Sequence, residues 1–382
     1  MNLLQNISRN IYPLNNKSMA NARKKFSVFC ESKSIFGRIE DICVKLVGIS
    51  GNNNNLNIDK KVILIFSADH GVYKKNTIFD NKKPAYNRIN DFLNGISPGA
   101  VLSKVCNADS VIVDVGIDDS KIETNNASEI NNSSKTKVNG SKKINYNLKS
   151  KSIILNQNKS FFNYKIRNAT SDILQGQAMS RNEAIRSIEV GIEVAESYII
   201  KDYNIIGASE ISPASEISAA AIVSVVTGKD PKDILDKYFN CKDKKYVDEA
   251  ELEKLASIVM KVIEINTVNP SDGIEILYKL GGFEIGAIVG AILGCSANKI
   301  PIVLDNLTSY ASALIAYKIN YKVFNYIFSP SFCDWIGNEH TFSFNLDNPV
   351  IDLNIRLSEG YGISALFNLL DMAVKTYNNI EV

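Results

Sequence analysis

The sequence predicts an α/β fold, a doubly wound parallel sheet of the Rossmann-like kind, with a small helical domain formed by the two chain termini. Short continuous apolar runs are typical of strands that are buried on both faces of a parallel sheet. Helical patterns fall between these runs, and this alternation is typical of strand–helix–strand units. The expected strands are Val62–Phe66, Ser110–Val115, Asn204–Gly207, Ile300–Leu304 and Val323–Phe328.

The chain divides into three stretches on these patterns. Residues 1–54 form the N-terminal part of the small domain, with amphipathic helices expected over Met19–Cys30 and Ile35–Val47. Residues 55–345 form the large α/β domain, and residues 346–382 complete the small one.

Residues 118–165 interrupt the alternation, because they are rich in Asn, Ser and Lys and poor in large apolar side chains. We expect a variable surface excursion there. The alternative is a basic patch for an anionic partner, although Glu123 and Glu129 dilute its charge.

Composition excludes several classes of function. The 382 residues carry a net charge of +2, which gives no electrostatic basis for binding nucleic acid or an anionic membrane. Two histidines and six cysteines without a C-x-x-C pair predict no metal site and no cofactor, and scattered thiols are typical of a cytoplasmic protein. The N-terminus lacks the apolar core of a signal peptide, and no run reaches the roughly 20 apolar residues of a membrane span.

Two helices have additional sequence signals. Ser180 and Glu183 form a capping-box pattern that starts a helix running to about Tyr198. A later helix has a glycine at every fourth position, which predicts a bare stripe where another element approaches closely. The stripe consists of Gly282, Gly286, Gly290 and Gly294.

Polar side chains follow the expected strands, at the edge where ligands bind in open parallel sheets. Acidic and hydroxyl groups dominate, and they suit a neutral or cationic substrate that carries hydroxyls. We expect His70 to make a structural hydrogen bond, and Asp305 either to cap a helix or to contact a ribose. The groups are Asp69 and His70, Asp114, Ser209, Glu210 and Ser212, Asp305 and Ser309, and Ser329 and Ser331.

The C-terminal segment Leu357–Gly362 presents a single carboxylate, Glu359, between small residues. It follows the strand-like run Val350–Ile355 and precedes a helical pattern over Ile363–Val374. A glutamate beside glycine can approach a ligand closely and act as a general base. Taken alone, the pattern is more typical of a solvated loop.

These motifs together resemble the nicotinate-nucleotide–dimethylbenzimidazole phosphoribosyltransferases, which build the lower-ligand nucleotide of cobalamin. The resemblance covers nearly the whole chain, with motifs in matching order and spacing. It rests on FGRIED (36–41), SADHGV (67–72), DFLNG (91–95), VDVG (113–116), AMS (178–180), LGGFEI (280–285), IPIVLD (300–305) and LSEGYG (357–362).

The resemblance implies transfer of phosphoribosyl from nicotinate mononucleotide to an aromatic base, 5,6-dimethylbenzimidazole or an analogue. The products are an α-ribazole-type 5′-phosphate and nicotinate. Glu359 matches the family's catalytic glutamate, and a homodimer or a heterodimer with a paralogue is implied. The residues expected to bind substrate are Ile78, Asn87, Ser209, Glu210, Ser212, Gly282, Asp305, Ser309, Leu357 and Gly360.

The chain departs from the family at its phosphate-binding motifs. The family's G-E-M-G-I-G-N-T-T is represented by Gly207–Ser215, which lacks the two internal glycines and contains Pro213. Asp236–Asn240 replaces a G-R-G-T-G element, and residues 330–337 lack the histidines of H-x-S-x-E-P-G-H. Three hypotheses follow. The first is an active transferase. The second is a weakly active or non-catalytic subunit that pairs with an intact paralogue, and the third is a nucleotide- or base-binding protein without turnover.

Overall fold

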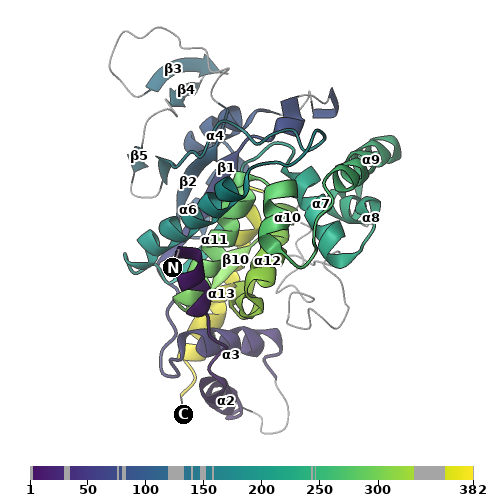
Figure 1. The fold of residues 1–382 in the computed structure, drawn as a ribbon. Helices are drawn as coiled ribbons and strands as arrows, with labels where there is room; N and C mark the ends of the chain where they lie inside the picture. The colour runs from purple at the N-terminus through teal and green to yellow at the C-terminus, as the bar shows by residue number, and fades with distance from the viewer. Residues whose placement is uncertain are drawn as a thin grey trace.

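A parallel sheet forms the centre of the protein (Figure 1). The structure, a computed structural model, describes residues 3–29, 35–74, 77–79, 83–118, 133–138, 141–146, 152–156, 159–241, 244–245, 247–330 and 358–381. Among these residues, seven strands form the central sheet in the order β11-β10-β7-β1-β2-β6-β5. All neighbours are parallel except β5 and β6, which confirms the predicted doubly wound sheet. The strands are β1 (Lys61–Ala68), β2 (Ala108–Gly116), β5 (Ser152–Asn156), β6 (Lys159–Asn163), β7 (Ile205–Glu210), β10 (Ile302–Leu304) and β11 (Ile327–Phe328).

Helices cover both faces of this sheet. On one face, α11 (Phe283–Ala297) packs against β1, β2 and β7 and against α6 (Arg181–Ile199). On the other face, α13 (Tyr361–Asn378) and α5 (Pro98–Val105) pack against each other and against β10 and β2. The remaining helices are α1 (Leu3–Arg9), α2 (Asn16–Phe26), α3 (Arg38–Ser50), α4 (Ala85–Leu93), α7 (Ser215–Thr227), α8 (Pro231–Phe239), α9 (Glu249–Ile265), α10 (Gly273–Leu280) and α12 (Leu307–Ile319).

The two ends of the chain pack together, as Figure 1 shows for the purple helices α2 and α3 beside the yellow end of α13. The rings of Phe26 and Tyr377 lie 5.8 Å apart. The Leu56 amide donates to Oδ1 of Asn378 at 2.9 Å. Helix α13 is therefore held at its far end by the N-terminal helices, while its first turn reaches the carboxyl edge of the sheet.

One predicted strand is wrong. The run Val323–Phe328 is a strand only at β11, and the 3₁₀ helix η3 (Tyr321–Tyr326) precedes it. The Asn320 side chain accepts from the Lys322 amide at 3.0 Å and starts this helical turn. A short buried apolar run has the same composition in a strand and in a buried turn, so periodicity alone did not separate them.

The excursion expected over residues 118–165 is also wrong in part. β6 pairs in parallel with β2, and β5 extends the sheet beyond β6. Phe161 on β6 is fully buried. β3 (Ser133–Val138) and β4 (Ser141–Tyr146) form a separate antiparallel pair. The polar composition of the whole segment masked the short apolar stretches within it.

Several expected features lie outside the described residues. They are the strand-like run Val350–Ile355, residue Leu357 and the stretch 331–337. Within the described part of the chain, no helix combines the length and the apolar character needed to span a bilayer.

The capping box and the glycine stripe are both present. The Glu183 amide donates to Oγ of Ser180 at 3.2 Å, and the Ser180 amide donates to Oε2 of Glu183 at 2.7 Å. The glycines of α11 let its backbone meet α6. A Cβ at Gly290 would lie 1.9 Å from the Ile188 carbonyl oxygen, whereas a Cβ at Gly294 would meet nothing nearer than 3.5 Å.

The α6–α11 contact gives a matched pair of predictions. Gly290→Ala forces two backbones apart, so we expect it to lower the free energy of unfolding by about 1–3 kcal/mol or more. Gly294→Ala has room for the methyl group, so we expect stability to stay within about 1 kcal/mol of wild type, because alanine favours helix over glycine. Urea unfolding measures both variants, and equal losses would contradict the packing described.

Candidate active site

Glu359 lies at the carboxyl edge of the sheet, in the turn that leads into α13. Its amide donates to the Glu210 carbonyl at 3.3 Å, and the Gly360 amide donates to Oγ of Ser209 at 3.0 Å. Both partners belong to the end of β7. Glu359 has φ +70° and Gly360 has φ +77°. A non-glycine residue in this left-handed region costs on the order of 1 kcal/mol, so surrounding contacts must hold Glu359 there.

Helix α5 provides one of those contacts. A Cβ at Gly99 would lie 2.3 Å from the carbonyl oxygen of Glu359 and 2.8 Å from its Cβ. Only glycine fits at this position. On the other side, a Cβ at Gly360 would lie 2.7 Å from the Ile63 side chain of β1. The turn is therefore seated tightly between α5 and the sheet.

Arg88 of α4 contacts the Glu359 carboxylate. Its Nε and Nη2 both donate to Oε1 of Glu359, at 3.3 and 3.1 Å. Nη2 also donates to Oγ of Ser358 at 3.0 Å. The arginine side chain is 27% exposed and the glutamate side chain 13%, so the ion pair is largely withdrawn from water.

Arg88 was not among the residues that the sequence predicted for the site. A signal was present, because Arg88 lies at helical spacing from Ala85 and Phe92, which are both buried. A charged side chain on that apolar face needs a partner. The neighbouring Asn87, which was expected to bind substrate, is exposed.

Buried carboxylates surround this turn. Glu210 and Asp305 are 3% and 2% exposed, and Glu284 is fully buried. Oε1 of Glu210 accepts from the Asn306 side chain at 3.0 Å, but its Oε2 has no hydrogen-bond partner among the described residues. Both carboxylate oxygens of Asp305 and Oε2 of Glu284 also have no hydrogen-bond partner among the described residues. Buried acceptors without partners are rare in proteins, so these oxygens are candidates for ligand contact.

Burial raises the pKa of Glu210 to about 8, although the Arg88 guanidinium opposes the shift. Burial likewise raises the pKa of Asp305 to about 7, with the Ser209 hydroxyl and the amides at the start of α13 opposing it. Carboxyl groups of this kind favour a hydroxyl donor or a cation as their ligand, because either one replaces the stabilisation that the carboxylate loses when it is buried away from water.

His70 forms a buried pair with Glu284, Nε2 to Oε1 at 2.6 Å, and its Nδ1 lies 3.4 Å from Oγ of Ser218. Burial lowers the pKa of His70, but the carboxylates of Glu284, Glu210 and Asp69 outweigh it and raise the pKa overall. Gly282 makes room for this pair, since a Cβ there would lie 2.4 Å from Oε1 of Glu284. The contacts described for His70 and Gly282 are therefore internal ones.

The serines at the strand ends also bond to the backbone. Oγ of Ser212 accepts from the Ala68 amide at 3.1 Å. Oγ of Ser309 accepts from the amides of Asp305 and Asn306, at 3.2 and 3.0 Å. Asn306 is the N-cap of α12, so the expected alternative of Asp305 as a helix cap is wrong. The Asp305 carboxylate instead lies near the Ser209 hydroxyl and the amides at the start of α13, without reaching hydrogen-bond geometry with them.

The structure brings only some of the expected residues together. Glu359, Gly360, Ser209, Glu210 and Asp305 share one site. Ile78, in the 3₁₀ helix η2 (Thr77–Phe79), is partly buried against the hydrophobic core. Among the described residues, no cluster of three or more His, Cys, Asp or Glu side chains is arranged to hold a metal ion.

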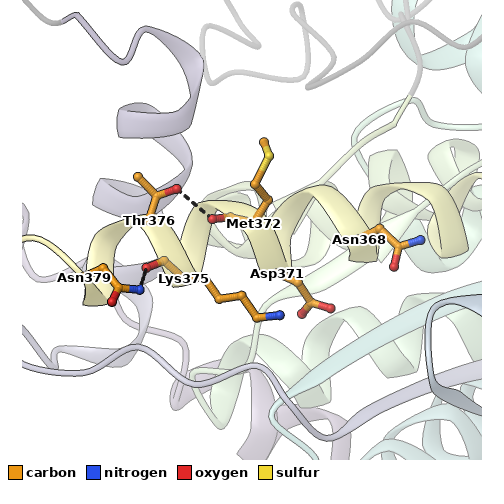
Figure 2. A pocket seen from close by; sticks show the side chains of 6 residues that line it. All are labelled: Asn368, Asp371, Met372, Lys375, Thr376 and Asn379. Carbon is orange, nitrogen blue, oxygen red and sulfur yellow. Dashed lines mark hydrogen bonds between the residues drawn. The ribbon is translucent and has the colours of Figure 1, made fainter.

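A groove runs along α13 (Figure 2), and none of the residues that line it belongs to this site. It has a volume of about 540 Å³ and is lined by Asn368, Asp371, Met372, Lys375, Thr376 and Asn379. Thr376 and Asn379 donate to carbonyls of the same helix, and Asp371 pairs with Lys61 at 3.1 Å. These three polar side chains already have partners, so the acidic site at the sheet edge is the better candidate for chemistry.

Known proteins resemble this chain over nearly its whole length. The family described as phosphoribosyltransferase matches residues 11–382, which defines the chain as an enzyme of the transferase class. A nicotinate-nucleotide–dimethylbenzimidazole phosphoribosyltransferase of Clostridioides difficile is 37% identical over 381 residues, covering 100% of this chain and 97% of the relative. Another, from Ruminiclostridium cellulolyticum, is 31% identical over 370 residues, covering 97% and 93%.

The solved structures agree in fold. A crystal structure of the enzyme with this name from Thermus thermophilus superposes with a TM-score of 0.73 at 20% identity, covering 95% of this chain and 96% of that one. The chain belongs to the family of nicotinate-nucleotide–dimethylbenzimidazole phosphoribosyltransferases.

The buried acids predict how stability depends on pH. The pKa of Glu210 rises from 4.5 to about 8 on folding. Above about pH 4.5 the unfolded chain releases this proton while the folded chain retains it, so Glu210 lowers the free energy of unfolding as the pH rises to about 8. Glu210→Gln removes that dependence, which is on the order of a few kcal/mol. Urea unfolding at pH 5.5, 7 and 8.5 tests this, and identical slopes for variant and wild type would contradict it.

Proposed function

We propose that the chain transfers phosphoribosyl from nicotinate mononucleotide to 5,6-dimethylbenzimidazole or an analogous base, giving an α-ribazole-type 5′-phosphate and nicotinate. The observation that carries the proposal is the position of Glu359. This carboxylate is fixed by its backbone to the end of β7. The same edge of the sheet carries the buried carboxylates of Glu210 and Asp305, which have oxygens without a hydrogen-bond partner among the described residues.

Glu359 supplies the base that this reaction requires. One ring nitrogen of the acceptor attacks C1′ of the ribose, while the proton of the other ring nitrogen passes to Glu359. The bond between C1′ and the pyridinium nitrogen breaks, and its electron pair stays on nicotinate. Because the leaving ring becomes neutral as the bond breaks, no acid is needed. Attack on the face opposite the leaving group converts the β-nucleotide into the α-product.

The buried acids suit the substrate. Ribose hydroxyls can donate to the free oxygens of Glu210 and Asp305. The pyridinium and the positive charge that develops at C1′ are both stabilised by carboxylates in a site of low dielectric. Ser209 and Gly360 fix the turn that brings Glu359 to this place. Ile78, Asn87 and Leu357 are proposed to line the slot for the aromatic base.

The phosphate group is proposed to be held weakly. The segment Gly207–Ser215 lacks internal glycines, and the hydroxyls of Ser209 and Ser212 already accept from backbone amides. A phosphate cradle depends on free amides and close backbone approach. We expect titration calorimetry with nicotinate mononucleotide to give a Kd well above the low micromolar range. A low micromolar Kd for the purified chain would contradict this prediction.

A dimer is also proposed, either of two copies or with a paralogue whose glycine loops are intact. The apolar side chains exposed on and beside α5 favour such an interface. They are Ile96, Val101 and Val105, which are 62%, 50% and 67% exposed. Size-exclusion chromatography of the chain alone and after co-expression with the paralogue distinguishes the two, and a monomer in both cases would contradict the proposal.

The role of Glu359 is tested by Glu359→Gln. This variant keeps the size of the side chain but removes the base, so we expect kcat to fall about 10² to 10⁴-fold with little change in KM. Nicotinate release from nicotinate mononucleotide and 5,6-dimethylbenzimidazole is the measurement. Glu193→Gln, which changes an exposed residue of α6, is the matched control and should retain wild-type turnover. Full activity of the Glu359 variant would remove Glu359 from the mechanism.

A further inference from the structure

Arg88 contacts Glu359 in a way that bears on how the base works. We infer that Arg88 is a positioning residue, which holds one oxygen of the Glu359 carboxylate so that the other oxygen faces the acceptor base. The inference rests on the proposed function of Glu359 and adds a residue that this function does not itself require.

The contact geometry supports a clamp. Nε and Nη2 of Arg88 both donate to the same oxygen, Oε1, at 3.3 and 3.1 Å. Oε2 of Glu359 is left out of this ion pair and remains available for the acceptor's proton. Nη2 also holds Ser358 by its Oγ at 3.0 Å, so the guanidinium fixes two successive side chains of the turn.

The surrounding backbone restricts the movement of Glu359. Its backbone has φ +70°, and Gly99 of α5 stands against its carbonyl oxygen. Arg88 itself comes from α4, a different element from the turn that it holds. The carboxylate is thus fixed by its backbone on one side and by the guanidinium on the other. A general base needs such support, because a displacement of about 1 Å can cost 10²-fold in rate.

Charge keeps the clamp in place. Burial lowers the pKa of Arg88, but the carboxylates of Glu359 and Glu210 outweigh this effect and raise the pKa overall, so the guanidinium remains a cation. Arg88 bonds directly to Glu359 and is also within electrostatic range of Glu210. Without Arg88, the largely buried carboxylate of Glu359 loses its counter-charge. Loss of Arg88 should therefore move the Glu359 side chain away from the site.

The kinetic test compares Arg88→Met with Arg88→Lys. We expect Arg88→Met to lower kcat about 10 to 100-fold while KM for nicotinate mononucleotide and for 5,6-dimethylbenzimidazole stays within about 3-fold. Arg88→Lys keeps the charge but loses the two-donor geometry, so it should recover only part of the rate. Arg186→Met, which removes an exposed arginine from α6, is the matched control and should retain wild-type rates.

Two kinetic outcomes would overturn the inference. An unchanged kcat in Arg88→Met would show that Glu359 needs no clamp. A KM raised tenfold or more with kcat intact would show that Arg88 binds a substrate instead of positioning the base. If Arg88→Met does not fold, Arg88→Lys and Ser358→Ala replace it, and both should lower kcat without raising KM.

A second measurement separates this inference from the proposed function. The melting temperatures of Arg88→Met, Glu359→Gln and the double variant form a thermodynamic cycle. We expect the double variant to lose less than the sum of the two single losses, because both substitutions break the same pair. Strictly additive losses would show that the pair is not coupled. If wild type releases no nicotinate, the proposed function fails, and the cycle alone decides whether Arg88 holds the carboxylate.

Discussion

The site depends on carboxylates that folding removes from water while leaving some of their oxygens without a hydrogen-bond partner among the described residues. Glu210 and Asp305 are almost fully buried, and burial raises the pKa of both. Such groups lower the stability of the empty protein around neutral pH. On folding, each carboxyl group must either retain a proton that the unfolded chain releases or carry its charge in a site of low dielectric. A ligand that brings hydroxyl donors and positive charge relieves this cost. Stability is therefore exchanged for affinity towards one class of ligand.

The sheet and its glycines create this arrangement. A Cβ at Gly207 would lie 2.4 Å from Ile363, so α13 lies almost on β7, and the turn that carries Glu359 follows from that close packing. Gly99 closes the other side of the turn. On the opposite face, the α6–α11 contact holds Phe283 and Glu284 under the same sheet edge. Glu359, Arg88 and the buried acids thus come from elements far apart in sequence that small residues allow to meet.

The sequence predicted the parts of this architecture that are local. Continuous apolar runs identified β1, β2 and β7, because strands buried on both faces have no polar alternation. Glu359 was predicted to be the general base from its small neighbours and from its match to the family's catalytic glutamate, and the structure places it at the carboxyl edge of the sheet. Arg88 was missed because its partner lies 271 residues away, and no local pattern encodes that distance. Hydroxyl composition at a strand end also does not reveal that the side-chain oxygens of Ser212 and Ser309 accept hydrogen bonds from backbone amides.

The central claim is that Glu359 acts as the single general base for an inverting phosphoribosyl transfer, and that this transfer takes place in a buried, acidic site. The most direct measurement is the anomeric configuration of the product. The purified chain, incubated with nicotinate mononucleotide and 5,6-dimethylbenzimidazole, should give an α-linked nucleotide by proton NMR, with nicotinate released in equal amount. A β-linked product, or ribose 5-phosphate and nicotinate without a nucleotide, would contradict the account.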